Sequence, residues 1–114
     1  MSGGTGMRVV LTDRFQDDAD GHYFWLLVNR PSGAAPAWAA AVRNAVRAAA
    51  TNADGHPVCS DPLVSGRGLR QRAFGPGRRP THRLIFEVDA AAGEVRFLAC
   101  RGLSRPDLTP ADLR

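Results

Sequence analysis

The stretch from Gly66 to Arg101 constrains the fold more than any other part of the chain, because it has the pattern of consecutive β-strands. Segments 69–74, 81–88 and 94–101 each read as a strand, and in the second His82, Leu84, Phe86 and Val88 form one mostly apolar face. A Gly-Pro-Gly-Arg-Arg-Pro loop separates the first two segments, and residues 89–93 supply the turn into the last. Short connections of this kind favour a meander of antiparallel strands.

The strongest charge bias falls on the same stretch. No Asp or Glu occurs between Asp61 and Glu87, whereas the segment from 67 to 83 contains six arginines, which are Arg67, Arg70, Arg72, Arg78, Arg79 and Arg83. Since residues two apart share one face of a strand, Arg70 and Arg72 lie on the same face of the first strand. Arg83 lies on the face of the second strand that is turned away from its mostly apolar face. We expect these three side chains to converge on one open sheet face as a polyanion site. A solvated, arginine-rich face without a ligand fits the same pattern.

Length and composition indicate one domain with basic character. The chain has 114 residues, a net charge of +4 and a pI near 10.4, which favours acidic or polyanionic partners. All 15 basic residues are Arg, a preference that a GC-rich coding sequence explains without phosphate recognition. Residues 1–7 are expected to be a flexible tail without a secretory signal, and no apolar run approaches the roughly 20 residues of a membrane span. Cys59 and Cys100, with no CxxC motif, favour a reduced, cytoplasmic protein.

The remaining chain predicts one strand and two helices. Residues 8–12 read as a strand, and 37–51 as a helix that follows breaks at residues 31–33 and at Pro36. Residues 15–30 are ambiguous, with helical spacing favoured slightly over a strand that follows the Asp20-Gly21 turn signal. Trp25 and Trp38 are expected in the core. The order strand, helix, helix, strand, strand, strand predicts an α+β domain over residues 8–102. In it two helices pack on one face of a small, mainly antiparallel four-stranded sheet, and a polar tail covers residues 103–114 with a short helical turn from Thr109.

The sequence THRLIFEV at 81–88, followed by GEVRFLACR at 93–101, resembles the C-terminal hairpin of RelE/YoeB-like toxins of the RelE/ParE superfamily, which belong to type II toxin–antitoxin systems. In that family a basic strand leads to a motif of the HRLVY or YRIVY type, and the last strand ends in an arginine. The resemblance covers most of residues 7–102, with the helical half similar in pattern alone. It implies a RelE-like fold in which residues 15–28 are helical.

The resemblance implies a ribosome-dependent mRNA endoribonuclease that needs no metal and no cofactor. Its partners would be mRNA in the ribosomal A site and a cognate antitoxin. Cleavage by attack of the ribose 2′-hydroxyl on the adjacent phosphate requires a base, cations that stabilise the phosphorane, and an acid. The residues that match the family pattern in these roles are Arg83, Arg70, Arg72 and Arg101 as cations and Asp61 as the base, with Arg67, Arg78 and Arg79 as further RNA contacts.

The chain departs from the family at the end of the last strand. Residues 100–104 read Cys-Arg-Gly-Leu-Ser, without the histidine or tyrosine that family members place there. His56 and His82 are possible replacements, although His82 alternates onto the apolar face and is expected to be packed. Two other functions therefore remain open: a ParE-like inhibitor of DNA gyrase that cleaves nothing, and a catalytically silent relative that binds RNA or a protein. Asp54, His56, Cys59 and Asp61 lie close in sequence, but their spacing fits no zinc pattern, so no metal site is expected.

Overall fold

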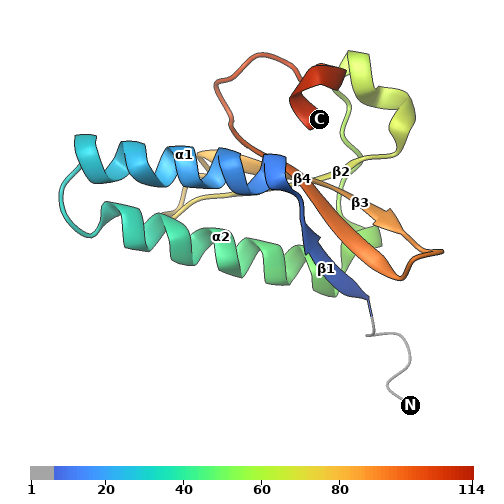
Figure 1. Cartoon of the computed structure of the whole chain (residues 1–114), viewed down its shortest axis with the longest axis horizontal. Helices are drawn as coiled ribbons and strands as arrows, with labels where there is room; N and C mark the ends of the chain where they lie inside the picture. The colour runs from blue at the N-terminus through green and yellow to red at the C-terminus, as the bar shows by residue number, and fades with distance from the viewer. Residues whose placement is uncertain (1–6) are drawn as a thin grey trace.

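The computed structural model describes residues 7–114, and the element order matches the predicted one (Figure 1). The predicted tail at residues 1–7 lies outside the described residues except for Met7. The helices and strands are β1 (Arg8–Leu11), α1 (Asp13–Asn29), α2 (Ala34–Thr51), β2 (Arg70–Phe74), β3 (His82–Asp89) and β4 (Glu94–Gly102). Within residues 7–114, three short 3₁₀ helices accompany them, η2 (Ala53–Gly55), η3 (Pro62–Arg67) and η4 (Pro110–Leu113).

The strands form one mixed sheet in the order β1-β4-β3-β2. The pairs β2–β3 and β3–β4 are antiparallel, as the short connections predict, whereas β1 runs parallel to β4. The parallel pair arises because the chain leaves β1, forms both helices and re-enters the sheet at its opposite edge. The α+β class is therefore confirmed, with one parallel pairing in a mainly antiparallel sheet.

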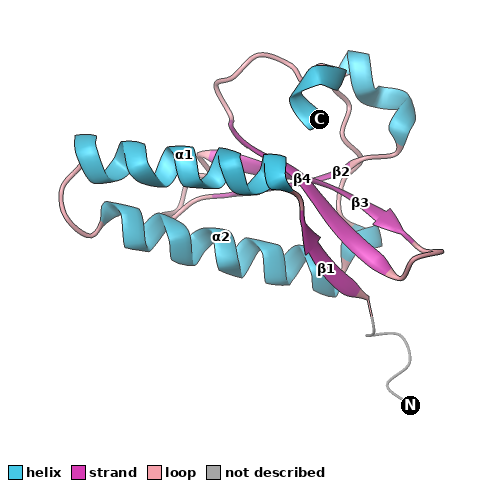
Figure 2. Ribbon diagram, viewed as in Figure 1, coloured by secondary structure: helices cyan, strands magenta, loops and turns pink. Residues whose placement is uncertain are grey.

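Both helices lie side by side over one face of the sheet (Figure 2). Helix α1 begins after Thr12, whose side chain accepts a hydrogen bond from the Phe15 N–H at 3.2 Å, and it runs through Gly21 without a break. The helical interpretation of residues 15–30 is thus confirmed. The break predicted at Pro36 is wrong, because this proline lies in the first turn of α2, where its missing N–H would have no helical partner.

The main hydrophobic core lies between the two helices and the sheet. Its largest members come from both helices and from β2, β3 and β4, and they are Phe15, Trp38, Phe74, Leu84, Phe86, Val95 and Phe97. Trp38 is buried as predicted, but Trp25 is 45% exposed, so its predicted place in the core is wrong. No helix among residues 7–114 combines the length and the apolar character needed to cross a bilayer.

The second face of the sheet is covered, which contradicts the predicted open face. Residues 59–69, with η3, and the C-terminal segment 103–114 fold over it, and both lie on the same side of the sheet in Figure 1. They enclose a second apolar cluster that contains Cys59, Val64, Leu69, Ile85, Leu98, Ala99 and Leu108. The predicted C-terminal tail is therefore part of the fold, although its short helical turn, η4, forms where expected, with Thr109 and Asp112 in a capping box.

Candidate functional site

The strand register separates the arginines that were predicted to converge. Arg70 pairs with Phe86 and Arg72 with Leu84, so both arginines lie on the helix side of the sheet. Ala73 pairs with Arg83, which places Arg83 on the opposite side. Directly opposed residues of an antiparallel pair share a face, and a shift of one residue moves every side chain to the other face. The alternation inside each strand is predicted correctly, but the expected convergence is wrong because of the register between strands.

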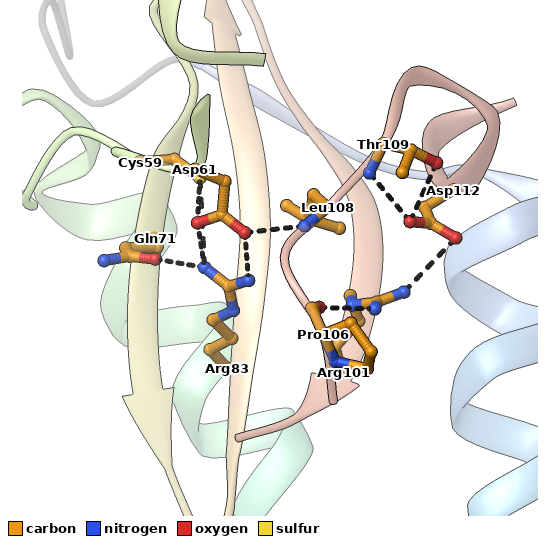
Figure 3. Close-up of polar contacts among 9 residues, drawn as sticks. All are labelled: Cys59, Asp61, Gln71, Arg83, Arg101, Pro106, Leu108, Thr109 and Asp112. Atoms are coloured by element: carbon orange, nitrogen blue, oxygen red, sulfur yellow. Dashed lines mark hydrogen bonds and ion pairs between the residues drawn. The ribbon is translucent and has the colours of Figure 1, made fainter. Parts of the chain in front are cut away.

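Arg83 and Asp61 form a bidentate ion pair on the side of the sheet opposite α1 and α2 (Figure 3). Arg83 Nη1 and Nη2 lie 2.8 and 2.6 Å from the two carboxylate oxygens of Asp61, and Nη1 also lies 2.8 Å from Gln71 Oε1. Asp61 further accepts the Leu108 N–H at 2.7 Å and the Cys59 thiol at 3.3 Å. The two groups that the resemblance assigns as cation and base are therefore bound to each other.

This arrangement is poorly suited to the predicted chemistry. The Arg83 guanidinium, helped by the Leu108 and Cys59 donors, holds the pKa of the buried Asp61 carboxyl well below its usual range. A carboxylate that holds its charge so strongly is a weak acceptor for a hydroxyl proton. Arg83 would have to break its hydrogen bonds to Asp61 before its guanidinium could bind a phosphate. The geometry instead makes the pair a structural link between the loop before η3, strand β3 and the C-terminal segment.

Arg101 is also committed to structure. Its side chain is 7% exposed, its Nη2 donates to the Pro106 carbonyl oxygen at 2.9 Å, and its Nη1 lies 3.4 Å from Asp112 Oδ1 (Figure 3). Asp112 in turn caps η4 through Thr109. The arginine at the end of the last strand thus anchors the C-terminal segment.

Edge strand β2, whose outer edge is partly bonded by residues 57–59, brings together a different group. The turn η2 places His56 beside β2, where its Nε2 lies 3.0 Å from Arg72 Nη1 and its Nδ1 lies 2.7 Å from the Asn52 carbonyl oxygen. Arg70 Nη1 donates to the His56 carbonyl oxygen at 2.9 Å. The sequence offers His56 as a possible replacement for the missing family residues. Its contact with Arg72 joins residues 16 apart, so no local sequence pattern could predict it.

Two cavities follow this edge. The first has a volume of about 350 Å³ and is lined by His56, Pro57, Gln71, Arg72, Ala73, Arg83 and Leu103. The second, of about 660 Å³, lies between α2 and the β2–β3 loop, with alanines 37, 40, 41 and 45 on one side and Asn44, Arg72 and Arg78 among the polar lining groups. Arg72 and Ala73 line both cavities, and among residues 7–114 no acidic side chain lines either one. Arg78, Arg79 and Arg67, the predicted RNA contacts, are exposed.

His82 is packed, as predicted. Its ring lies 4.3 Å from that of His22 and 5.2 Å from that of Trp38, and the Trp38 Nε1–H points at its Nδ1 across 3.4 Å. Burial, with a further contribution from His22, lowers the pKa of His82 to about 4. The ring is therefore neutral near pH 7 and belongs to the core, not to a site that exchanges protons with a substrate.

Neither cysteine has the environment of a nucleophile. Cys59 and Cys100 are both free and buried, and burial raises the pKa of the Cys100 thiol to about 12. Among residues 7–114, no three His, Cys, Asp or Glu side chains are grouped so as to hold a metal ion.

Comparisons of the chain with protein-family models, with curated proteins and with solved structures find no match.

Proposed function

We propose that this chain is a RelE/YoeB-like toxin that cleaves mRNA on the ribosome without a metal, and that it holds the message along the edge strand β2. The motif at 81–88 with the strand that follows it, and the element order, support this proposal from the sequence side. The observation that carries it is the β2 edge itself. There Arg72 lines two cavities, with His56 in the smaller one and Arg78 in the larger one, and within the part of the chain that the structure describes no acidic side chain lines either of them. Arg70 lies beside them, bound to the His56 carbonyl oxygen.

Such an edge has the chemistry that RNA requires. The arginine fork binds phosphate through two parallel hydrogen bonds and stays charged at every physiological pH. Arg78 and Arg79 extend the charge along the loop after β2, and both are exposed. Attack of a ribose 2′-hydroxyl on the adjacent phosphate gives a 2′,3′-cyclic phosphate and a 5′-hydroxyl end. Cations on the phosphate stabilise the extra charge of the transition state.

A second function, that of a ParE-like inhibitor of DNA gyrase, is favoured by different observations. The Arg83–Asp61 pair and the buried Arg101 leave the family's usual catalytic positions occupied by structural contacts. The C-terminal half of α1 also exposes Phe24, Trp25, Leu27 and Val28, and Val28 is 82% exposed. Apolar patches of this kind favour a protein partner, which would be gyrase in this second function or a cognate antitoxin in either one.

Primer extension on a message translated in a cell-free system separates the two functions. Wild-type protein is compared with a variant that carries Arg72→Ala, Arg78→Ala and Arg79→Ala, and with Arg105→Ala, which removes an exposed arginine that lines neither cavity. New 3′ ends within codons, formed with wild type and Arg105→Ala but not with the triple variant, support the nuclease. Intact message together with loss of DNA supercoiling by purified gyrase supports the second function and contradicts the first.

A further inference from the structure

We infer that His56 is the general base of the proposed cleavage and that Arg72 binds the phosphate that its reaction attacks. The inference rests on the proposed nuclease function. It moves the catalytic roles from the predicted Arg83 and Asp61 to His56 and Arg72 at the β2 edge. Arg83 lines the same small cavity but is bound to Asp61.

The hydrogen bonds of His56 define its protonation state. Arginine has no acceptor, so the contact between Arg72 Nη1 and His56 Nε2 at 3.0 Å requires a lone pair on Nε2. The ring proton then lies on Nδ1, which donates to the Asn52 carbonyl oxygen at 2.7 Å. His56 is therefore a neutral imidazole whose one available lone pair, on Nε2, accepts from Arg72 in the free protein. In the proposed site Arg72 Nη1 turns to the phosphate when RNA binds, which leaves the Nε2 lone pair free beside that phosphate.

The ring is held in this orientation by three further contacts. The His56 N–H donates to the Ala53 carbonyl oxygen at 3.2 Å, which closes the turn η2. Arg70 binds the His56 carbonyl oxygen at 2.9 Å and is a positioning residue in this scheme. The ring forms a T-shaped contact with the ring of Phe86, with centroids 5.6 Å apart. With His56 fixed in this way, only the Arg72 guanidinium has to move when a phosphate binds.

The two cavities suit single-stranded RNA. His56 and Arg72 line the smaller cavity, which takes a ribose and its phosphate. Arg72 also lines the larger cavity, where the small side chains of α2 leave a flat apolar surface for a base and Asn44 offers an amide to its polar edge. Duplex RNA presents its phosphates without splaying a nucleotide, so the site is specific for a single strand.

The cleavage step balances with water as the only additional reactant. The proton of the 2′-hydroxyl passes to His56 Nε2 as the 2′-oxygen bonds to phosphorus, and the bond from phosphorus to the 5′-oxygen breaks. Water protonates the leaving 5′-oxygen, and the resulting hydroxide takes the proton from the His56 imidazolium. Arg72 stays charged throughout and neutralises the phosphorane.

The test is single-turnover cleavage of a translated message by the full chain, as wild type, His56→Gln and His22→Gln. Glutamine keeps an acceptor for Arg72 but has no basic nitrogen, and His22→Gln makes the same chemical change away from β2. We expect His56→Gln to cleave at least about a hundredfold more slowly, while its binding to a single-stranded RNA oligonucleotide changes less than about twofold. We also expect the wild-type rate to fall with decreasing pH along an acid limb that His22→Gln retains.

Each outcome either supports or contradicts the assignment of His56 as the general base. If wild type cuts and His56→Gln cuts equally fast with the same acid limb, the assignment of His56 is wrong and the nuclease function stands. If wild type leaves the message intact, both the function and the assignment are wrong. Should His56→Gln fail to fold by circular dichroism, the wild-type pH profile still decides, because a rate without an acid limb contradicts a histidine base.

Discussion

Asp61 and Arg83 face each other in a two-point ion pair, with nitrogen–oxygen distances of 2.6 and 2.8 Å, on the side of the sheet away from the helices. Asp61 also binds the Leu108 N–H, so one carboxylate links three segments that are far apart in the sequence (Figure 3). This arrangement makes the pair part of the structure that covers the sheet. The arginine that best matches the family motif is thus important for folding in this chain.

Replacing Arg83 by alanine should lower the free energy of unfolding by about 3 kcal/mol, because it leaves the buried Asp61 carboxylate without its cation. Urea denaturation at pH 7 measures the change in the free energy of unfolding. The motif alone would predict an Arg83→Ala variant with an intact fold and abolished activity. A double variant with Asp61→Ala should be destabilised by less than the sum of the two single changes, and strict additivity would contradict the coupling.

Asp61 should make the free energy of unfolding decrease as the pH becomes acidic. Its folded-state pKa is depressed, chiefly by Arg83, so its contribution is present above its ordinary pKa of 3.8 and declines as the pH falls below that value. Urea midpoints at pH 6, 4 and 3 should fall more steeply for wild type than for Asp61→Asn, which carries no charge there. Parallel curves for the two proteins would show that Asp61 is not responsible.

His82 should produce a second pH dependence at higher pH. Its folded-state pKa of about 4 lies below the ordinary value of 6.5, so between these values the unfolded chain binds a proton that the folded chain excludes. Stability should therefore fall by about 3 kcal/mol from pH 6.5 to pH 4. The groups that face this ring are His22 from α1, Trp38 from α2, and Phe74 and Thr81 from the β2–β3 hairpin.

Replacing His82 by phenylalanine tests that assignment. The variant should be less stable at pH 7, because the Trp38 N–H is left without its acceptor. Its stability should change less between pH 6.5 and pH 4 than that of wild type. An equally steep decline would assign the effect to another group, of which His22 is the nearest.

The C-terminal segment should contribute to stability as a core element. Leu108 is fully buried, so Leu108→Ala should cost about 3 kcal/mol in the free energy of unfolding. Leu103→Ala is a matched control, because Leu103 belongs to the same segment and is 46% exposed. Equal, small effects of both variants would mean that residues 103–114 behave as the tail that the sequence suggests.

Binding of single-stranded RNA should depend steeply on salt. Arg72→Ala, Arg78→Ala and Arg79→Ala each remove one cation from the proposed phosphate-binding edge, so each should lower the slope of log affinity against log salt by about 1. Fluorescence anisotropy with a labelled oligonucleotide between low and moderate salt measures the slope. Arg105→Ala should leave it unchanged, and a salt-independent affinity would exclude a phosphate-binding edge.

Local patterns in the sequence determined the elements and the class of the fold. Alternation identified β2, β3 and β4 within about a residue at each end, and the spacing of Trp38, Val42, Val46 and Ala49 identified the core side of α2. His82 was expected to be packed because it alternates with Leu84 and Phe86, and it is. These features depend on neighbours a few residues apart, which a sequence displays directly.

The tertiary structure alone decided which side chains meet. The register between β2 and β3 places Arg72 opposite Leu84 and Ala73 opposite Arg83, and no local pattern specifies that alignment. The ion pair of Asp61 with Arg83 spans 22 residues, and the bond from Leu108 to Asp61 spans 47. A charged residue on a strand is read as exposed until the segment that covers it is known. The sequence therefore shows how many arginines there are and on which strands they lie. The packing of residues 59–69 and 103–114 decides which of these arginines remain available to a ligand.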